Sequence, residues 1–510
     1  MKSISKIYLV AIIVSVSLAS YAHEGQEDED ILIKNLGNLG KVNFSVSCTL
    51  DAQKGMNAGV GLLHHMMYAQ AELLFAQWIE KEPDCAMMYW GYSMSLFHPL
   101  WSDSIKAEAL TRGQSALATA RKLKSTTREK TYIHAASQYY ENGEMVSDQT
   151  RTAKWAKAQA IVYQQNPNDI DAAAFFGLSK LAIASKKDST FSQNKQVGAF
   201  LDKFRRQSPT HPGVIHYTIH AYDNTLLAKL AVEAARDYDK IAPDVPHALH
   251  MPSHIFTRLG MWSDVISWNI RSATAALNYP TNGSTTMHYV HAMDYLVYGY
   301  LQLGEGDKVQ QALEQVESKH PHQATFPAAY ALSAMPARLA LEQRNWQQAS
   351  QLKTQEPSYI AWQNFPEVEA ITYYARGLGA ARNNDLKAAK ENLKVLDTLY
   401  EKTKIKSPDY WATLVDAQRK VVQSWITFSV GEKTQALTEL RQAADIEESL
   451  DKAPVTPGAV IPARELLADM LFLNGDYSGA LTEYKLSLTI SPNRLNSVSG
   501  VKNALLKMKE

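Results

Sequence analysis

The sequence predicts an all-α protein, a right-handed α-solenoid of about eleven helix–turn–helix repeats with a C-terminal capping helix. Small and apolar residues recur at helical spacing along most of the chain, and strand-like alternation is not sustained anywhere. A block of prolines and histidines is also repeated 34 residues further on. The matched pairs are Pro209 and Pro243, Pro212 and Pro246, His216 and His250, and His220 and His254.

A repeat length of 34 residues is typical of tetratricopeptide-like helix–turn–helix units. The first unit begins near Cys48 and ends at Pro83, because a proline stops the second helix of a repeat. The second unit turns near Pro99, and the third, fourth and fifth units end at Pro167, Pro209 and Pro243. The sixth unit ends at Tyr279. This register places the first six repeats between Cys48 and Tyr279.

The C-terminal half continues the pattern with glycine and asparagine at its turns, where the backbone needs angles that β-branched residues resist. Five further units turn at Gly304, Asn345, Asn383, Gly431 and Gly475. Residues 503–509 are expected to form the capping helix. Residues 46–510 are therefore predicted to be a single solenoid.

The N-terminus has the pattern of a secretory signal peptide over residues 1–22. Lys2 and Lys6 precede an apolar stretch at residues 7–18, and Ser20-Tyr21-Ala22, with small residues at both ends, forms a cleavage site. The apolar stretch is too short for a comfortable membrane span, and no other segment approaches one. Residues 23–45 are expected to be a flexible acidic segment. We therefore predict a soluble, exported protein, periplasmic or secreted.

The overall charge is balanced, with 52 basic and 52 acidic residues, which disfavours a nucleic-acid partner. The chain has two cysteines, Cys48 and Cys85. Export permits a disulfide between them, which we favour over two unpaired thiols.

Several sequence blocks resemble a family of secreted bacterial tetratricopeptide-repeat proteins. They lie at residues 84–91, 211–223, 246–260, 291–298, 462–467 and 491–495. The resemblance covers most of the chain after the signal peptide. It implies the repeat fold and an export route, and it implies no particular reaction.

The histidines are the main concentration of chemically useful side chains. In a solenoid of this type, the first helix of each repeat lines the concave surface. Histidines four residues apart share one face of a helix. Three consecutive repeats should therefore direct seven candidate metal ligands toward one concave region: His216, His220, His247, His250, His254, His291 and Asp294.

Three interpretations of this cluster remain open. Imidazoles could hold a transition metal such as copper, zinc or iron, and Met251 and Met287 slightly favour copper. The histidines could instead belong to a ligand-binding groove together with Tyr217, Tyr222, Arg258 and Tyr289. They could also simply fill helix interfaces as hydrogen-bonded partners.

These interpretations lead to different functions. An exported scaffold that binds a peptide or protein in its concave groove is the common use of such an architecture. The alternative is a transition-metal-binding protein, or a metal-dependent enzyme, centred on the histidine cluster. A metal-free enzyme with histidine as general base is a further possibility. The chain lacks a glycine-rich phosphate loop, a GxSxG elbow and an HExxH pair, so the motifs leave enzymatic activity open.

Overall fold

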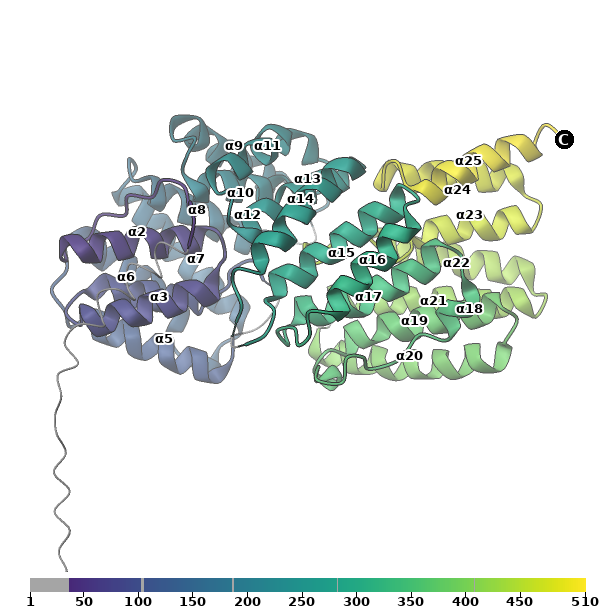
Figure 1. The fold of residues 1–510 in the computed structure, drawn as a ribbon, viewed down its shortest axis with the longest axis horizontal. Coiled ribbons are helices and arrows are strands. Elements are labelled where there is room, and N and C mark those ends of the chain that lie inside the picture. The colour runs from purple at the N-terminus through teal and green to yellow at the C-terminus, as the bar shows by residue number, and fades with distance from the viewer. Residues whose placement is uncertain (1–35, 102–104, 186–187, 282, 408) are drawn as a thin grey trace, which may run out of the picture.

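A computed structural model describes residues 36–101, 105–185, 188–281, 283–407 and 409–510. Within these ranges the protein is an all-α array of helical hairpins, which confirms the predicted fold class (Figure 1). The only extended pairings among the described residues are two isolated bridges at Thr281 and Thr285. The predicted signal peptide lies outside the described residues.

The first six hairpins occupy the N-terminal half of the described chain (Figure 1). Their helices are α2 (Leu50–His64) with α3 (Tyr68–Lys81), α4 (Ala86–Ser95) with α5 (Ala107–Ala120), α6 (Thr127–Tyr140) with α7 (Asp148–Gln165), α8 (Ile170–Ala182) with α9 (Ser192–Gln207), α10 (Pro212–Tyr222) with α11 (Val232–Ile241), and α12 (Pro246–His250) and α13 (Pro252–Arg258) with α14 (Trp262–Ala276). The first helix of the sixth hairpin is divided in two at Pro252, which has no backbone N–H to donate.

Five more hairpins follow in the part of the C-terminal half that the structure describes. They are α15 (Met287–Gln302) with α16 (Gly306–Glu317), α17 (Phe326–Glu342) with α18 (Trp346–Ser350), α19 (Pro366–Arg382) with α20 (Leu386–Lys406), α21 (Tyr410–Ser429) with α22 (Lys433–Glu448), and α23 (Ala463–Leu473) with α24 (Tyr477–Ile490). Helix α25 (Leu495–Lys507) packs on α24 as a cap. Gly304 and Gly475 have positive φ angles at two of the predicted turns.

The N-terminal segment packs against the repeats from Leu36 onward, although residues 23–45 were expected to be flexible. Phe44 is fully buried and stacks on Trp90, with ring centroids 5.0 Å apart. The Tyr279 hydroxyl donates to the Leu36 carbonyl at 2.9 Å. These apolar and backbone contacts hold the segment, whereas the prediction weighed only its acidic beginning. A disulfide joins Cys48 to Cys85 just beyond it, at the starts of the first two hairpins.

A second connecting segment, residues 449–462 between α22 and α23, lies against the first helices of the middle repeats. The Tyr295 hydroxyl on α15 donates to the carbonyls of Pro454 and Thr456 at 2.9 and 3.0 Å. Arg338 on α17 donates to the Ala459 carbonyl at 2.8 Å. The expected concave wall is therefore covered, over these repeats, by the chain itself.

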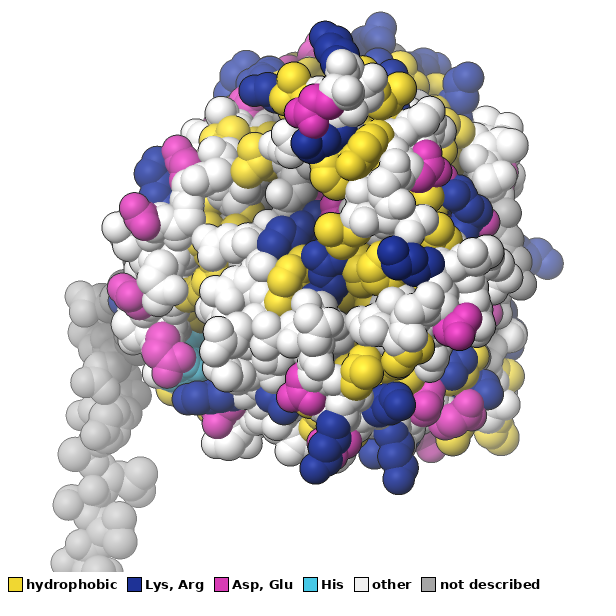
Figure 2. Space-filling view, turned by 90° about the vertical axis from the view of Figure 1, so that its right-hand side faces the viewer, with side chains coloured by type: hydrophobic (Ala, Val, Ile, Leu, Met, Phe, Trp, Pro, Cys, Tyr) yellow, Lys and Arg dark blue, Asp and Glu magenta, His cyan; other side chains and the backbone are white. Residues whose placement is uncertain are grey.

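The surface at the C-terminal end of the array has mixed charge. Lys and Arg side chains are interspersed there with Asp, Glu and hydrophobic side chains (Figure 2). Among the described residues, no helix combines the length and the apolar character needed to cross a membrane.

Candidate metal centre

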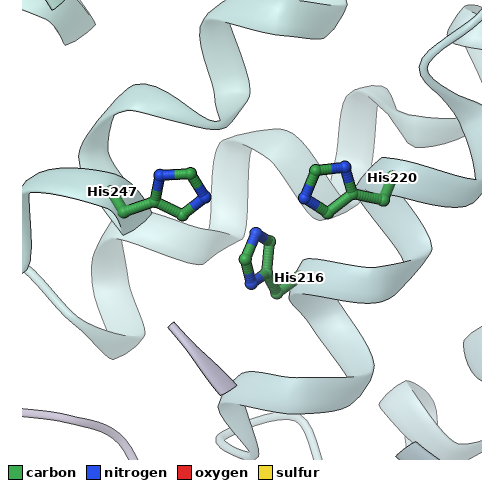
Figure 3. Close-up of side chains that lie close together, drawn as sticks. All are labelled: His216, His220 and His247. Atoms are coloured by element: carbon green, nitrogen blue, oxygen red, sulfur yellow. The ribbon is translucent and has the colours of Figure 1, made fainter. Parts of the chain in front are cut away.

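Six of the predicted histidines converge between the fifth, sixth and seventh hairpins. Set A contains His216 and His220 from α10 and His247 from α12, and Figure 3 shows its three rings turned toward a common point. Set B contains His250, His254 and His291, from α12, α13 and α15. Within each set, one ligand atom per residue lies within 4.8 Å of the others. Each set could therefore close around one metal ion.

The two sets adjoin each other. The ring centroids of His247 and His250 are 6.3 Å apart, and those of His220 and His254 are 6.4 Å apart. The 34-residue repeat explains this arrangement, because it gives α10 and the α12–α13 pair equivalent positions in consecutive hairpins. The two sets together form one six-histidine centre.

Hydrogen bonds determine which nitrogen carries the proton in two of the set B rings, His250 and His254. Nδ1 of His250 lies 2.7 Å from Oδ1 of Asn269, whose amide nitrogen donates to the Val265 carbonyl. Nδ1 of His254 lies 2.8 Å from Oδ2 of Asp223. Both partners are acceptors, so both Nδ1 atoms are donors and both Nε2 atoms carry lone pairs in the neutral rings.

These two lone pairs face each other. Nε2 of His250 lies 3.0 Å from Nε2 of His254. Burial lowers the pKa of both imidazoles, that of His250 well below its usual value, which favours the neutral rings. Two opposed lone pairs repel, and a cation between them removes the repulsion. Tetrahedral zinc with 2.0–2.1 Å bonds would place two nitrogens about 3.3 Å apart, close to the observed separation.

Set A leaves buried nitrogens without hydrogen-bond partners among the described residues. Nδ1 of His216 donates to the His64 carbonyl at 2.6 Å, and its Nε2 has no partner. Nε2 of His220 and both nitrogens of His247 also have none. Burial lowers the pKa of all three rings, that of His220 to about 3. An unpaired buried polar atom costs about 1–3 kcal/mol, so a purely structural role explains these rings poorly.

Charged residues border the centre on the side of Asp223. Asp223 accepts from His254 and from Nε of Arg258, the latter at 3.0 Å. Arg258 also pairs with Asp451, and Nζ of Lys452 lies 3.5 Å from Asp223. Burial lowers the pKa of Lys452 to about 8. The 449–462 segment therefore brings a cation to the edge of the histidines.

Asp294, the seventh predicted metal ligand, lies outside both sets. Its Oδ1 accepts from Nε of Arg338 at 3.1 Å, and both side chains are fully buried. Burial raises the pKa of Asp294 to about 6. The helical spacing of Asp294 from His291 was read correctly, but the spacing could not show that an arginine from α17 occupies that face.

The four predicted groove residues are buried and have partners within the chain, unlike the wet concave wall that was expected. The Tyr217 hydroxyl contacts Nδ1 of His64 at 3.1 Å, and Arg258 pairs with two carboxylates. Tyr222 is buried beside Gly198, and the ring of Tyr289 stacks with that of His322. Their predicted role in binding a peptide stays a prediction.

A third cluster, which the sequence interpretation missed, consists of His64, Asp171 and His211. Nε2 of His64 and Nε2 of His211 lie 2.9 and 3.1 Å from the same Asp171 oxygen, and both can donate to it. Nδ1 of His64 can then accept from Tyr217. The bonds of His64 are satisfied without a metal, whereas Nδ1 of His211 and Oδ2 of Asp171 have no hydrogen-bond partner among the described residues. A carboxylate already lies between the two rings of this cluster, which distinguishes it from sets A and B.

Sequence spacing also missed the residues that orient the histidines. Asn269 is on α14, a second helix, where no histidine pattern drew attention to it. Asp223 was visible in the sequence three residues after His220, at a spacing that places it on the same helical face. That spacing is the one signal that could have associated it with the cluster.

Solved structures that resemble this chain do so at low sequence identity and low TM-score. No protein-family model and no curated protein matches the sequence. Solved structures that resemble it include yeast Tom70, at 14% identity over 90% of this chain and 96% of that chain, with a TM-score of 0.35. The Cut9–Hcn1 hetero-tetramer of APC/C matches at 13% identity over 89% and 90%, with a TM-score of 0.31. The P58(IPK) TPR domain matches at 12% over 90% and 98%, with a TM-score of 0.23.

These similarities are too low to carry a functional argument. The all-α repeat fold rests on the hairpins themselves, and the function has to be argued from the histidine centre.

Proposed function

We propose that this helical repeat protein binds transition-metal ions at its six-histidine centre. The observation that carries the proposal is the pair of Nε2 atoms of His250 and His254, 3.0 Å apart. The Nδ1–H group of each ring donates a hydrogen bond to an oxygen, that of His250 to Asn269 and that of His254 to Asp223. Metal-bound histidines in proteins are oriented in this way.

The ligand type narrows the choice of metal. Sets A and B consist of imidazoles alone, which suit copper, zinc and iron. Neutral imidazoles offer lone pairs without first losing a proton, and burial keeps these rings neutral. One ion in each set gives an expected content of two ions per chain. A metal with histidine ligands can polarise a bound molecule or lower the pKa of a bound water, so the proposal includes a metal-dependent enzyme.

Elemental analysis of the untagged protein, purified from its own host, tests the proposal. We expect about two transition-metal ions per chain in the wild type, one for each set. A His250→Ala/His254→Ala double variant should lose the ion of set B. X-ray absorption should show nitrogen ligands at about 2.0–2.1 Å.

The matched control removes two histidines that lie outside the centre. His134 is exposed, and His320 contacts Tyr359 and Glu317. A His134→Ala/His320→Ala variant should keep the full metal content. Metal-free wild-type protein, or the same metal content in both double variants, would contradict the proposal. If the wild-type protein is metal-free, a proton shared between the Nε2 atoms of His250 and His254 would explain their short contact.

The peptide-binding scaffold that the repeat architecture suggests has no comparable observation behind it. Arg258, the charged residue predicted to bind a peptide, is already held by Asp223 and Asp451. The elemental analysis also tests this alternative, because a peptide-binding scaffold requires no bound metal.

A further inference from the structure

Lys452 is a cation that the sequence pattern does not associate with the histidines. It belongs to the 449–462 segment, which arrives at the centre from the far end of the chain. Its carbonyl accepts from Nη2 of Arg258 at 3.3 Å, and Arg258 also holds the neighbouring Asp451. The backbone at Lys452 is thus fixed from one side, while its side chain turns inward to Asp223.

The ammonium group of Lys452 has unused hydrogen-bonding capacity. An ammonium has three N–H donors. An oxygen of the Asp223 carboxylate lies 3.5 Å from its buried Nζ, at the limit of hydrogen-bond distance, and Nζ makes no closer hydrogen bond to the described residues. Its charge acts on His220, His254 and His291, which come from both sets. A buried donor therefore lies beside the proposed metal ligands.

The charge of the loaded centre points to the kind of molecule that would bind there. Imidazole ligands are neutral, so they do not cancel the charge of a divalent ion. Arg258 and Lys452 add positive charge, and the carboxylates of Asp223 and Asp451 already pair with them. Buried charge is costly unless an opposite charge compensates it.

We infer that Lys452 is the anion-binding residue of the metal centre, and that the centre takes a small anionic ligand or substrate. This inference rests on the proposed metal function. One end of the anion binds a metal ion, and Lys452 donates a hydrogen bond to it. The anion compensates the positive charge of the centre, as the buried site requires.

Azide titration of the Cu²⁺-loaded protein tests the inference, with binding followed by visible absorption. A charge-assisted hydrogen bond of ordinary strength implies that Lys452→Met weakens azide binding about tenfold or more. Metal content should not change, because Lys452 is not a ligand. Lys452→Arg, which keeps the charge and the donors, should retain most of the azide affinity. Lys452→Gln replaces the methionine variant if that protein does not fold.

Lys406→Met is the control variant. Lys406 on α20 also pairs with a carboxylate, that of Glu367 at 3.1 Å, but lies outside the centre. We expect wild-type azide affinity for this variant. Equal azide affinity in the wild type and the neutral Lys452 variants, at equal copper content, would overturn the anion-binding inference alone. Wild-type protein that takes up neither Cu²⁺ nor Zn²⁺ at the histidines would overturn the proposed function and this inference with it.

Discussion

The hydrogen bond from His250 to Asn269 should control metal affinity although Asn269 touches no metal. Asn269 is fully buried, and its Oδ1 accepts from Nδ1 of His250 at 2.7 Å. Replacement of Asn269 by leucine keeps the approximate shape and removes the acceptor. The proton of His250 can then move to Nε2, the atom that would bind the metal, or the ring can turn away.

The expected effect has two parts. Loss of an outer hydrogen-bond partner typically weakens metal binding 10- to 100-fold, which corresponds to about 1.4–2.8 kcal/mol. The metal-free protein also loses about 1–3 kcal/mol of folding free energy, because Nδ1 of His250 is left buried without its acceptor. Competition with a coloured chelator measures the first quantity, and urea unfolding measures the second.

Asn392 offers a closely matched control. Its side-chain nitrogen donates to the Ala388 carbonyl four residues earlier, as that of Asn269 donates to Val265, and its Oδ1 accepts from Arg376. Asn392→Leu should therefore lower the folding free energy and leave metal affinity unchanged. Wild-type metal affinity in Asn269→Leu would refute the argument that this residue sets the protonation of His250.

Two further predictions concern stability. The disulfide between Cys48 and Cys85 spans 37 positions, so a Cys48→Ala/Cys85→Ala variant should be about 4 kcal/mol less stable to urea. A loss below about 1 kcal/mol would contradict this entropic estimate. Burial lowers the pKa of His65 to about 3 from its ordinary value of 6.5. As pH falls, the His65 imidazole is therefore protonated in the unfolded chain before it is protonated in the folded protein. Below pH 6.5 this group lowers the free energy of unfolding by about 1.4 kcal/mol for each pH unit. His65→Gln should reduce the pH slope of the unfolding free energy by that amount between these two pKa values.

The order of residues in the sequence was enough to predict the repeats. Their prolines, turn glycines and 34-residue spacing are local signals, since each hairpin contacts mainly its neighbours. The same regularity predicted that His216, His220, His250 and His254 would share one side of consecutive first helices. Four residues along a helix bring side chains to one face whatever the rest of the chain does.

The tertiary structure alone decided the environment of those histidines. The sequence suggested an open concave wall, but residues 449–462 cover it, and Lys452 reaches Asp223 from 229 positions away. The same contacts remove Asp294 and Arg258 from their predicted roles, because each is paired with a charge from a distant helix or segment. Repeat spacing determines which residues face inward. Contacts between residues far apart in the sequence follow no period, so only the folded chain shows which partners those residues meet.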